Sequence, residues 1–390
     1  MTGLRFDGRN PGMGFLTFLS VVCVVLPGIA AAAILDLRQA PYSAVGDGKA
    51  DDRGALAAAL SDAKSGDVIF IPAGEYRIVM GKGRLTMADG VTLLGEGGKS
   101  KVSVVSDGGE KEHREFLQPG SDCTLQGMTF MRGANFPAVL FPLFGERKNI
   151  VFRDCVFEGG TEKFQGNYCH AFQVGNGALD RLTFDKIEMR GFTFGLFQAN
   201  QAKGSLKNVT VVRSLFERNA SSDLEFNSPN GTMTDIVVKD CVFRDNLSKN
   251  ASGGFAVGFA NVQRGTVENC RIENYGAEAL HVEDRSEDIR LVGNTIVGGS
   301  RIQTNGVILV VNDSRKVKIE RNYVDGRPNE NKVNLVLVTA GGPKFANPSD
   351  VQVERNIFIN GASTRTWYLQ KGSGPEPVEN HVLPVAAEQK

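Results

Sequence analysis

Short apolar runs interrupted by one polar step recur along residues 128–361 of this chain. One copy reads Phe152-Arg-Asp-Cys-Val-Phe157 and another reads Val238-Lys-Asp-Cys-Val-Phe243. The apolar positions alternate around the polar step, which indicates two short strands and not a helical stripe. The fourth position of nine such copies, called the marker position below, falls at Met128, Cys155, Ile187, Ser214, Cys241, Cys270, Asn294, Asn322 and Asn356.

Another apolar run lies between successive copies, as in Asp223-Leu-Glu-Phe226 and Ala279-Leu-His-Val282. Three short strands in a repeat of roughly 28 residues describe one coil of a parallel β-helix. Like residues then stack about 4.8 Å apart along the axis. A propeller blade needs a longer repeat and hairpin turns. The pattern therefore predicts an all-β fold, a right-handed parallel β-helix solenoid.

The composition adds limits on partners. The chain has 390 residues, with 44 Lys plus Arg and 44 Asp plus Glu. This balance gives no global attraction to nucleic acid, so we expect no nucleic-acid partner. Five of the six cysteines follow residue 100, in an odd number and with no Cys-x-x-Cys. We expect buried thiols, although Cys241 and Cys270 lie on adjacent coils and their pairing stays open.

Residues 1–33 have the layout of a secretory signal peptide. Arg5 and Arg9 precede an uncharged stretch that contains four consecutive alanines. An uncleaved membrane anchor is the alternative, because the stretch is long enough to span a bilayer. We expect cleavage near Ile34, a secreted or periplasmic protein, and no stable membrane insertion afterwards.

Residues 44–78 predict an N-terminal cap and the first coil. Asp51 or Asp52 can cap a helix whose apolar face is formed by Leu56, Ala59, Leu60 and Ala63. Solenoids need such a capping helix, because an open end exposes backbone edges and core. The strand Val68–Ile71 follows and stops at Pro72.

The order Gly46-Asp-Gly-x-x-Asp-Asp52, a helix, then Val68-Ile-Phe-Ile-Pro-Ala-Gly-x-Tyr76 resembles the start of the pectate-lyase-like β-helix superfamily. This superfamily includes polygalacturonase-related hydrolases, polysaccharide lyases and epimerases. The resemblance implies that the protein acts on, or binds, a polysaccharide. It is specific for fold and weak for chemistry. We expect the β-helix domain to span residues 34–370 and a polar C-terminal tail to span 371–390.

The candidate site comes from alternation in the strand that follows each copy of the phrase. Aligning Phe172, Leu196, Leu224, Phe255, Leu280 and Val307 as an inward row places Gln173, Phe197, Glu225, Ala256, His281 and Ile308 in the next outward row. Asp223, Glu225 and Asn227 then project from one coil, and His281 and Glu283 project two coils further on. Gly254, Ala256 and Gly258 leave a hollow between them where a sugar could lie.

This arrangement predicts catalysis by Glu225, His281, Asp223 and Glu283. Residues i and i+2 on a strand are about 6.5 to 7 Å apart, near the carboxylate separation of inverting glycosidases. One carboxyl group would protonate the leaving oxygen while another activates water. The substrate would be bound by Asn227, Phe197, Gln173, Asp284, Arg218, Arg244 and Lys249.

Three alternatives stay open. Asp223, Glu225 and Glu283 could hold Ca²⁺, with Arg218, Arg244 or Lys249 as the base of a lyase, as the resemblance to pectate lyases implies. His281 could be the base of a uronan epimerase. A non-catalytic polysaccharide-binding or structural β-helix would instead use aromatic platforms such as Phe197, Tyr168, Trp367 and Tyr368. Alternation also predicts that His170 points inward, and the polar loop Asp107–Arg114 predicts a solvated His113.

Overall fold

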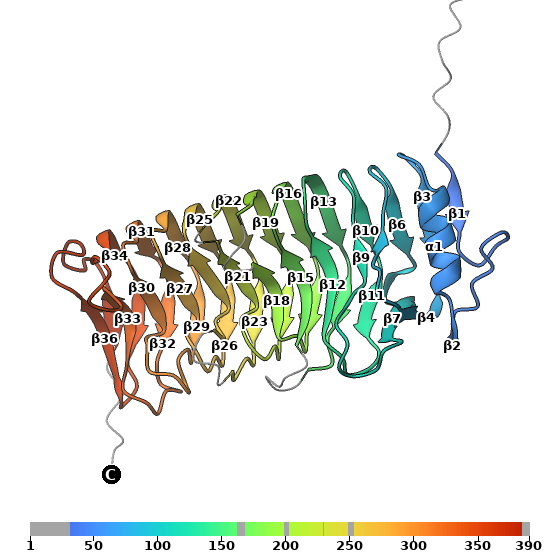
Figure 1. Ribbon diagram of the computed structural model, residues 1–390. Coiled ribbons are helices and arrows are strands. Elements are labelled where there is room, and N and C mark those ends of the chain that lie inside the picture. The colour runs from blue at the N-terminus through green and yellow to red at the C-terminus, as the bar shows by residue number, and fades with distance from the viewer. Residues whose placement is uncertain (1–31, 162–167, 199–202, 229, 249–252, 384–390) are drawn as a thin grey trace, which may run out of the picture. The chain divides into compact units, whose positions relative to one another are not determined.

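A computed structural model describes residues 32–161, 168–198, 203–228, 230–248 and 253–383. Residues 33–390 form one compact unit, and its strands stack coil upon coil in three parallel sheets (Figure 1). This confirms the all-β parallel solenoid. We expect the right-handed sense that parallel strand–connection–strand units almost always take.

Over the described residues, the first sheet contains twelve strands. In spatial order they are β1 (Ile34–Asp36), β3 (Val68–Ile71), β6 (Thr92–Gly95), β10 (Thr124–Gln126), β13 (Arg147–Arg153), β16 (Ala178–Asp185), β19 (Ser205–Val212), β22 (Thr232–Lys239), β25 (Val262–Glu268), β28 (Glu287–Val292), β31 (Arg315–Glu320) and β34 (Ser349–Glu354).

The second sheet contains thirteen strands within the same described ranges. They are β2 (Asp47–Asp51), β4 (Gly74–Met80), β7 (Ser100–Ser106), β11 (Thr129–Arg132), β14 (Val156–Glu158), β17 (Glu188–Arg190), β20 (Leu215–Glu217), β23 (Val242–Arg244), β26 (Arg271–Glu273), β29 (Thr295–Val297), β32 (Tyr323–Asp325), β35 (Ile357–Ile359) and β37 (His381–Leu383). Strand β37 lies inside the predicted tail and pairs with β35, so residues 381–383 extend the sheet.

The third sheet carries the predicted site and contains ten strands in the part of the chain that the structure describes. Along the chain they are β8 (Arg114–Glu115), β12 (Ala138–Leu143), β15 (Cys169–Val174), β18 (Phe194–Gln198), β21 (Leu224–Asn227), β24 (Val257–Ala260), β27 (Leu280–Glu283), β30 (Ile308–Val311), β33 (Val333–Thr339) and β36 (Thr364–Leu369). A short pair, β5 (Leu85–Thr86) and β9 (Leu117–Gln118), and a 3₁₀ turn, Gly97–Lys99, complete the early coils.

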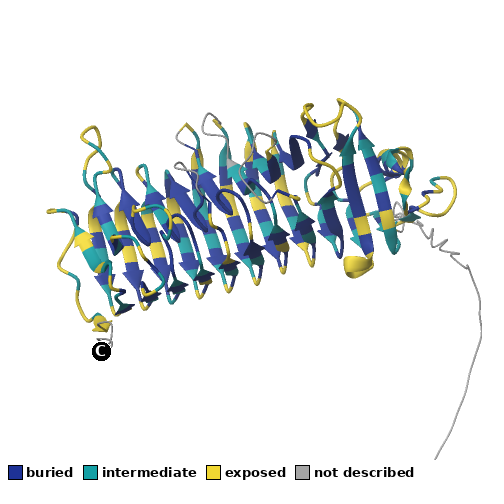
Figure 2. Cartoon of the chain, turned by 90° about the horizontal axis from the view of Figure 1, so that it is seen from below, coloured by how far each residue is buried: buried dark blue, intermediate teal, exposed yellow. Residues whose placement is uncertain are grey.

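The core is built from like side chains on successive coils, which Figure 2 shows as buried bands repeated along the strands. The rings of Phe216 and Phe243 stack with centroids 4.8 Å apart, and those of Phe152 and Phe184 with centroids 5.6 Å apart. These spacings match the distance between paired strands. Apolar burial and strand pairing therefore depend on the same register.

The marker positions explain why the polar step recurs. All nine markers are no more than 3% exposed. The residue before each has φ between 49° and 68°, in the left-handed region. This conformation turns the chain from the first sheet into the second and leaves the marker facing the interior. The predicted kink is confirmed, and Gly, Asp and Asn occupy most of these left-handed positions, as sterics favour.

Polar markers are accommodated by a ladder of buried asparagines. Asn322 Oδ1 accepts hydrogen bonds from the backbone amide and Nδ2 of Asn294, at 2.9 and 3.0 Å. Asn322 Nδ2 donates to the Leu291 carbonyl at 2.8 Å. Asn356 repeats the pattern on the next coil, with Asn380 beyond it. The cysteines Cys155, Cys241 and Cys270 fill the same position on other coils as buried free thiols.

Helix α1 (Arg53–Asp62) lies near the start of the stack and contacts β4 and β5. Leu56, Ala59 and Leu60 are buried, as predicted for its apolar face. Asp52 occupies the N-cap position, but its carboxylate accepts hydrogen bonds from the amides of Val45 and Gly46 and makes none to the helix. The capping role of α1 stays a prediction. No helix in the described ranges is both long and apolar enough to cross a membrane.

We predict that Asn322→Ala lowers the free energy of unfolding by about 1 to 3 kcal/mol for each buried group left without a partner. The amides of Asn294 lose their acceptor, and the Leu291 carbonyl loses its donor. Denaturant unfolding measures the effect. Asn176→Ala is the control, because it removes one exposed hydrogen bond, from the Lys203 amide to Asn176 Oδ1, and should change stability much less. Equal stabilities of the two variants would contradict a stabilising role for the asparagine ladder.

A second variant tests the cap. Leu60→Asp places a charge among buried apolar residues and should cost several kcal/mol. Ala58→Asp, on the exposed side of the same helix, controls for the change in helix propensity. If Leu60→Asp melts at the same temperature as Ala58→Asp, α1 does not close the stack.

Candidate functional site

The outer face of the third sheet carries a row of side chains that we call the strand row. Strand pairing places its members opposite one another, in the order Gln173, Phe197, Glu225, Gly258, His281 and Leu309. Four of the six predicted members are correct. Gly258 stands where Ala256 was predicted, and Leu309 stands where Ile308 was predicted.

The errors have one physical cause. At the corner before the third sheet, two consecutive residues face the core on each coil, because the chain bends there before the pleat begins. Ala256 and Val257 are both buried in the core, as are Ala279 and Leu280 on the next coil. Simple alternation from the corner therefore places Phe255 and Val307 in the wrong row.

Asp223 belongs to this inward corner and not to the outer face, which contradicts its predicted catalytic place. It is fully buried and accepts hydrogen bonds from Asn219 Nδ2, at 2.6 Å, and from Tyr275 OH. Burial raises the pKa of Asp223 to about 7, against the hydrogen bonds from Tyr275 and Asn219, which lower it. Asp223 is part of an internal polar network.

A second outward row, the corner row, precedes the inward pair on each coil. Its members are His170, Phe194, Ser222, Phe255, Glu278 and Gly306. Each of the first five interacts with the strand-row residue three positions later. The Phe194 and Phe197 ring centroids are 4.7 Å apart, for example, and Glu278 Oε1 lies 3.7 Å from His281 Nδ1. His170 therefore faces outward, against the inward prediction, and its ring centroid lies 4.8 Å from that of Phe197.

Glu225 sits in the middle of the strand row and is only 6% exposed. Its Oε2 atom has no hydrogen-bond partner among the described residues. Burial is the main reason that the pKa of Glu225 rises to about 7; Ser222 opposes the rise, Glu283 adds to it and His281 opposes it. A carboxyl group with this pKa exchanges a proton near neutral pH, as a general acid or base must.

His281 lies two coils further on, roughly 10 Å along the stack from Glu225. Its Nε2 is 3.3 Å from Glu283 Oε2, and Glu278 is on the side of Nδ1. Burial lowers the pKa of His281, but the two carboxylates outweigh burial and raise the pKa to about 10. His281 is therefore an imidazolium at neutral pH. Neither ring nitrogen has a hydrogen-bond partner of good geometry within the described ranges.

The predicted hollow between Glu225 and His281 is filled. A Cβ atom on Gly258 would lie 2.2 Å from the Phe255 ring, so the ring covers this glycine. The Phe255 and His281 ring centroids are 5.0 Å apart. Phe255 thus covers the strand-row position between the acid and the imidazolium.

Glu278 is the site residue that alternation missed. It is 3% exposed, and Asn305 Nδ2 donates to its Oε1 at 2.7 Å. Burial raises the pKa of Glu278, but His281 and Asn305 outweigh burial and lower it. Glu278 and His281 are three residues apart across a corner, and this spacing is the sequence feature from which their contact could have been predicted.

The other predicted binding residues are spread over the coils. Asn227 ends β21 opposite Ala260, and Asp284 accepts a hydrogen bond from Asn312 Nδ2 at 3.1 Å. Arg218 and Arg244 both pair with the buried Glu217 of the second sheet, each at 2.7 Å. Lys249 lies outside the described residues. Trp367 and Tyr368 lie in β36, the last strand of the third sheet.

The set predicted for Ca²⁺ is not assembled, because Asp223 faces the interior while Glu225 and Glu283 face outward. Across the described ranges, no three His, Cys, Asp or Glu side chains are grouped to hold a metal ion. The structure thus brings together Glu225, His281, Glu283 and Glu278, and it separates Asp223, Arg218 and Arg244 from them.

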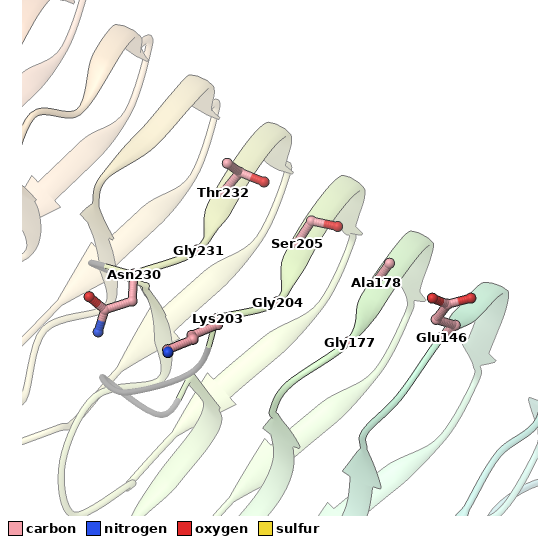
Figure 3. Close-up of a pocket in the computed structure, with 9 residues that line it drawn as sticks. All are labelled: Glu146, Gly177, Ala178, Lys203, Gly204, Ser205, Asn230, Gly231 and Thr232. Atoms are coloured by element: carbon pink, nitrogen blue, oxygen red, sulfur yellow. The ribbon is translucent and has the colours of Figure 1, made fainter.

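A shallow cavity of about 420 Å³ lies where the chain passes from the third sheet to the first, beside the starts of β16, β19 and β22 (Figure 3). Its floor contains Gly177, Gly204 and Gly231 on successive coils. A Cβ atom on Gly204 would lie 2.2 Å from the Gly177 carbonyl oxygen, so the coils approach too closely there for any side chain. Lys203 and Glu146 are the charged residues that line it. This cavity has no acid–base pair like that of Glu225 and His281.

Comparison with known proteins agrees with this architecture. Residues 40–308 match the family described as rhamnogalacturonase A/epimerase, pectate lyase-like. The chain belongs to this family. The match covers more than half of the chain and confirms the pectate-lyase-like β-helix resemblance.

Among the relatives, the mannuronan C5-epimerase AlgE4 of Azotobacter vinelandii is 27% identical over 236 residues, which is 57% of this chain and 36% of that protein. The chain spans 36% or less of the first epimerases it matches.

Two solved structures share the fold. The AlgE6 A-module of A. vinelandii has a TM-score of 0.52 at 16% identity, covering 90% of this chain and 100% of that one. The DFA-IIIase of Arthrobacter chlorophenolicus A6, solved without its lid, has a TM-score of 0.58 at 12% identity. The match covers 90% of this chain and 94% of that one.

We predict that the buried Asp223 makes stability fall as pH rises. Its folded pKa, about 7, lies above the unfolded value of about 4, so its carboxyl group stabilises the fold fully only below about pH 4. That contribution is lost as pH rises towards 7. Asp223→Asn should remove this part of the pH dependence and melt at a higher temperature than wild type near pH 8. The exposed Asp288→Asn is the control, and identical pH profiles of wild type and Asp223→Asn would contradict the assignment.

Proposed function

We propose that this protein acts on a polysaccharide that contains uronic acid, by removing the proton next to the uronate carboxylate at C5. The observation that carries the proposal is a buried carboxyl group, Glu225, with a pKa near 7 and an unpartnered oxygen, on the same row as a buried imidazolium, His281. Membership in a carbohydrate-active family and similarity to mannuronan C5-epimerases support a uronan substrate.

The two groups suit different parts of this step. The ionised form of Glu225 accepts the C5 proton. The imidazolium of His281 lies two coils further on, roughly 10 Å along the stack and beyond the Phe255 ring, so it is placed to bind the carboxylate of a neighbouring uronate unit. Glu278 and Glu283 keep His281 charged. Because the pKa of His281 is raised to about 10, we assign the base to Glu225 and not to His281, the base in the epimerase alternative.

Epimerisation is the favoured outcome. The C5–H bond breaks as its proton passes to Glu225, and its electron pair is delocalised into the carboxylate. A new C5–H bond then forms on the opposite face as a solvent water gives up a proton, and the resulting hydroxide takes the proton back from Glu225. No bond between C4 and its oxygen breaks. Glycosidic cleavage by β-elimination is the second candidate, since it begins with the same proton removal and then expels the oxygen at C4. The predicted hydrolytic pair of Asp223 and Glu225 is dropped, because Asp223 faces the core.

We also propose that the protein works outside the cytoplasm, in the periplasm or the medium. The charged, apolar and alanine-rich order of residues 1–33 supports export, and polysaccharides of this class are extracellular material. A non-catalytic binding protein remains the competing class, and the experiment below distinguishes it.

The test is solvent deuterium exchange at C5 of mannuronan, followed by NMR, with unsaturated-uronate absorbance read in parallel. Glu225→Gln should lower the exchange rate at least about a hundredfold, the usual size of a lost acid or base. The rate should rise as pH passes about 7, where Glu225 ionises, and fall as pH passes about 10, where His281 loses its charge.

Glu188→Gln, on the second sheet, is the matched control and should keep full activity. Exchange without absorbance identifies an epimerase, and exchange with absorbance a lyase. Mannuronan binding without either signal would overturn the catalytic proposal in favour of a binding protein.

A further inference from the structure

Four rings gather on the outer face of the third sheet, on the N-terminal side of Glu225. We call this group the aromatic patch; it consists of Tyr168, His170, Phe194 and Phe197. The His170 ring centroid lies 4.8 Å from that of Tyr168 and 5.3 Å from that of Phe194. Tyr168 is 37% exposed. The patch therefore presents ring faces and edges on the same surface as the candidate site.

A chain of polar side chains borders the patch. Tyr168 OH and His113 Nδ1 are 3.0 Å apart, and His113 Nε2 lies 3.7 Å from Glu115 Oε1. Arg84 donates to Glu115 Oε2 at 2.6 Å. Burial, with a smaller effect of Glu115, raises the pKa of Tyr168, so its hydroxyl stays protonated and is no base at neutral pH. Tyr168 therefore presents a neutral aromatic ring whose hydroxyl group is hydrogen-bonded to His113. His113 is exposed, as predicted.

His170 supplies an unused polar atom inside the patch. Its side chain is at least nine-tenths buried, and its Nδ1 has no hydrogen-bond partner among the described residues. Burial lowers the pKa of His170 to about 3, so the ring is neutral. A buried polar atom without a partner is costly, and a ligand hydroxyl is the kind of donor that would satisfy it.

The patch is in line with the candidate site. Phe197 pairs directly with Glu225 across neighbouring coils, and His170 pairs with Phe194 one coil earlier. His170 is thus two rungs, about 10 Å, from the coil of Glu225. This distance exceeds one pyranose ring, so an extended chain with one unit at Glu225 would place another unit over the patch.

We propose that the aromatic patch is a sugar-binding subsite, which holds a pyranose ring of the same polysaccharide at least one unit away from the reacting one. The apolar C–H face of the sugar packs on Tyr168 and Phe197, and a sugar hydroxyl donates to His170 Nδ1. The inference rests on the proposed function for the identity of the polymer. Its direct consequence is a preference for longer oligosaccharides.

The test measures binding of di-, tetra- and hexasaccharides of mannuronate by calorimetry in the Glu225→Gln background, where turnover is expected to be at least about a hundredfold slower. The parent should bind the hexasaccharide at least about tenfold more tightly than the disaccharide. Adding Tyr168→Ala should abolish that gain and leave the disaccharide affinity unchanged. Adding Tyr168→Phe, which keeps the ring, should retain most of it.

The outcomes separate the two proposals. A length-dependent gain that Tyr168→Ala removes supports the subsite even if C5 exchange is never observed. C5 exchange in the wild type with an unchanged length dependence in Tyr168→Ala overturns the subsite and leaves the proposed reaction standing. Absence of binding to all three oligosaccharides overturns the subsite as well. Melting temperatures confirm that each variant is folded.

Discussion

The structure depends on one constraint: each coil must stack on the last in the same register, with its backbone paired along three sheets at once. A left-handed residue before every marker position sets this register, because it fixes where the first sheet ends and the second begins. Burial of like rings and of the asparagine ladder then follows from stacking. A slip of one residue would send core side chains outward and unpair the ladder together.

The same constraint decides which side chains meet at the surface. Two consecutive residues face inward at the corner before the third sheet, so the outer face is supplied by positions three apart and not two apart. Glu278 reaches His281 in this way, and Phe255 reaches Gly258. The chemistry of the site is therefore set by corner geometry as much as by strand alternation. Glu225 has a raised pKa because burial disfavours its charge, whereas His281 on the same row has a raised pKa because Glu278 of the corner row and Glu283 outweigh the effect of burial.

Much of this could be predicted from the sequence, and the failures are local. The repeat period indicated the solenoid, and the apolar partners Leu224, Phe226, Leu280 and Val282 correctly turned Glu225, His281 and Glu283 outward. Asp223 was wrongly predicted to face outward, because the alternation of inward and outward side chains holds along a strand and not at the bend before it. The predicted hollow around Gly258 was wrong because the Phe255 ring covers this glycine. Phe255 precedes strand β24, and its position in the sequence does not indicate the direction of its side chain. Arg218 and Arg244 were predicted to bind substrate, but both pair with Glu217. The pair of Arg244 with Glu217 joins adjacent coils, and it can be predicted only once the coil register is known.

The corner geometry also bears on how such a chain changes in evolution. Both outward rows recur once per coil, so duplication or loss of a whole coil preserves every inward pair and every ladder bond except those at the joint. Insertion of a single residue within a strand does not, because it sends the following side chains to the wrong face. Successive markers are 24 to 34 residues apart, so coil length varies in the turns and loops between strands. A coil gained before β15 would lengthen the surface beside the aromatic patch while Glu225 and His281 keep their neighbours.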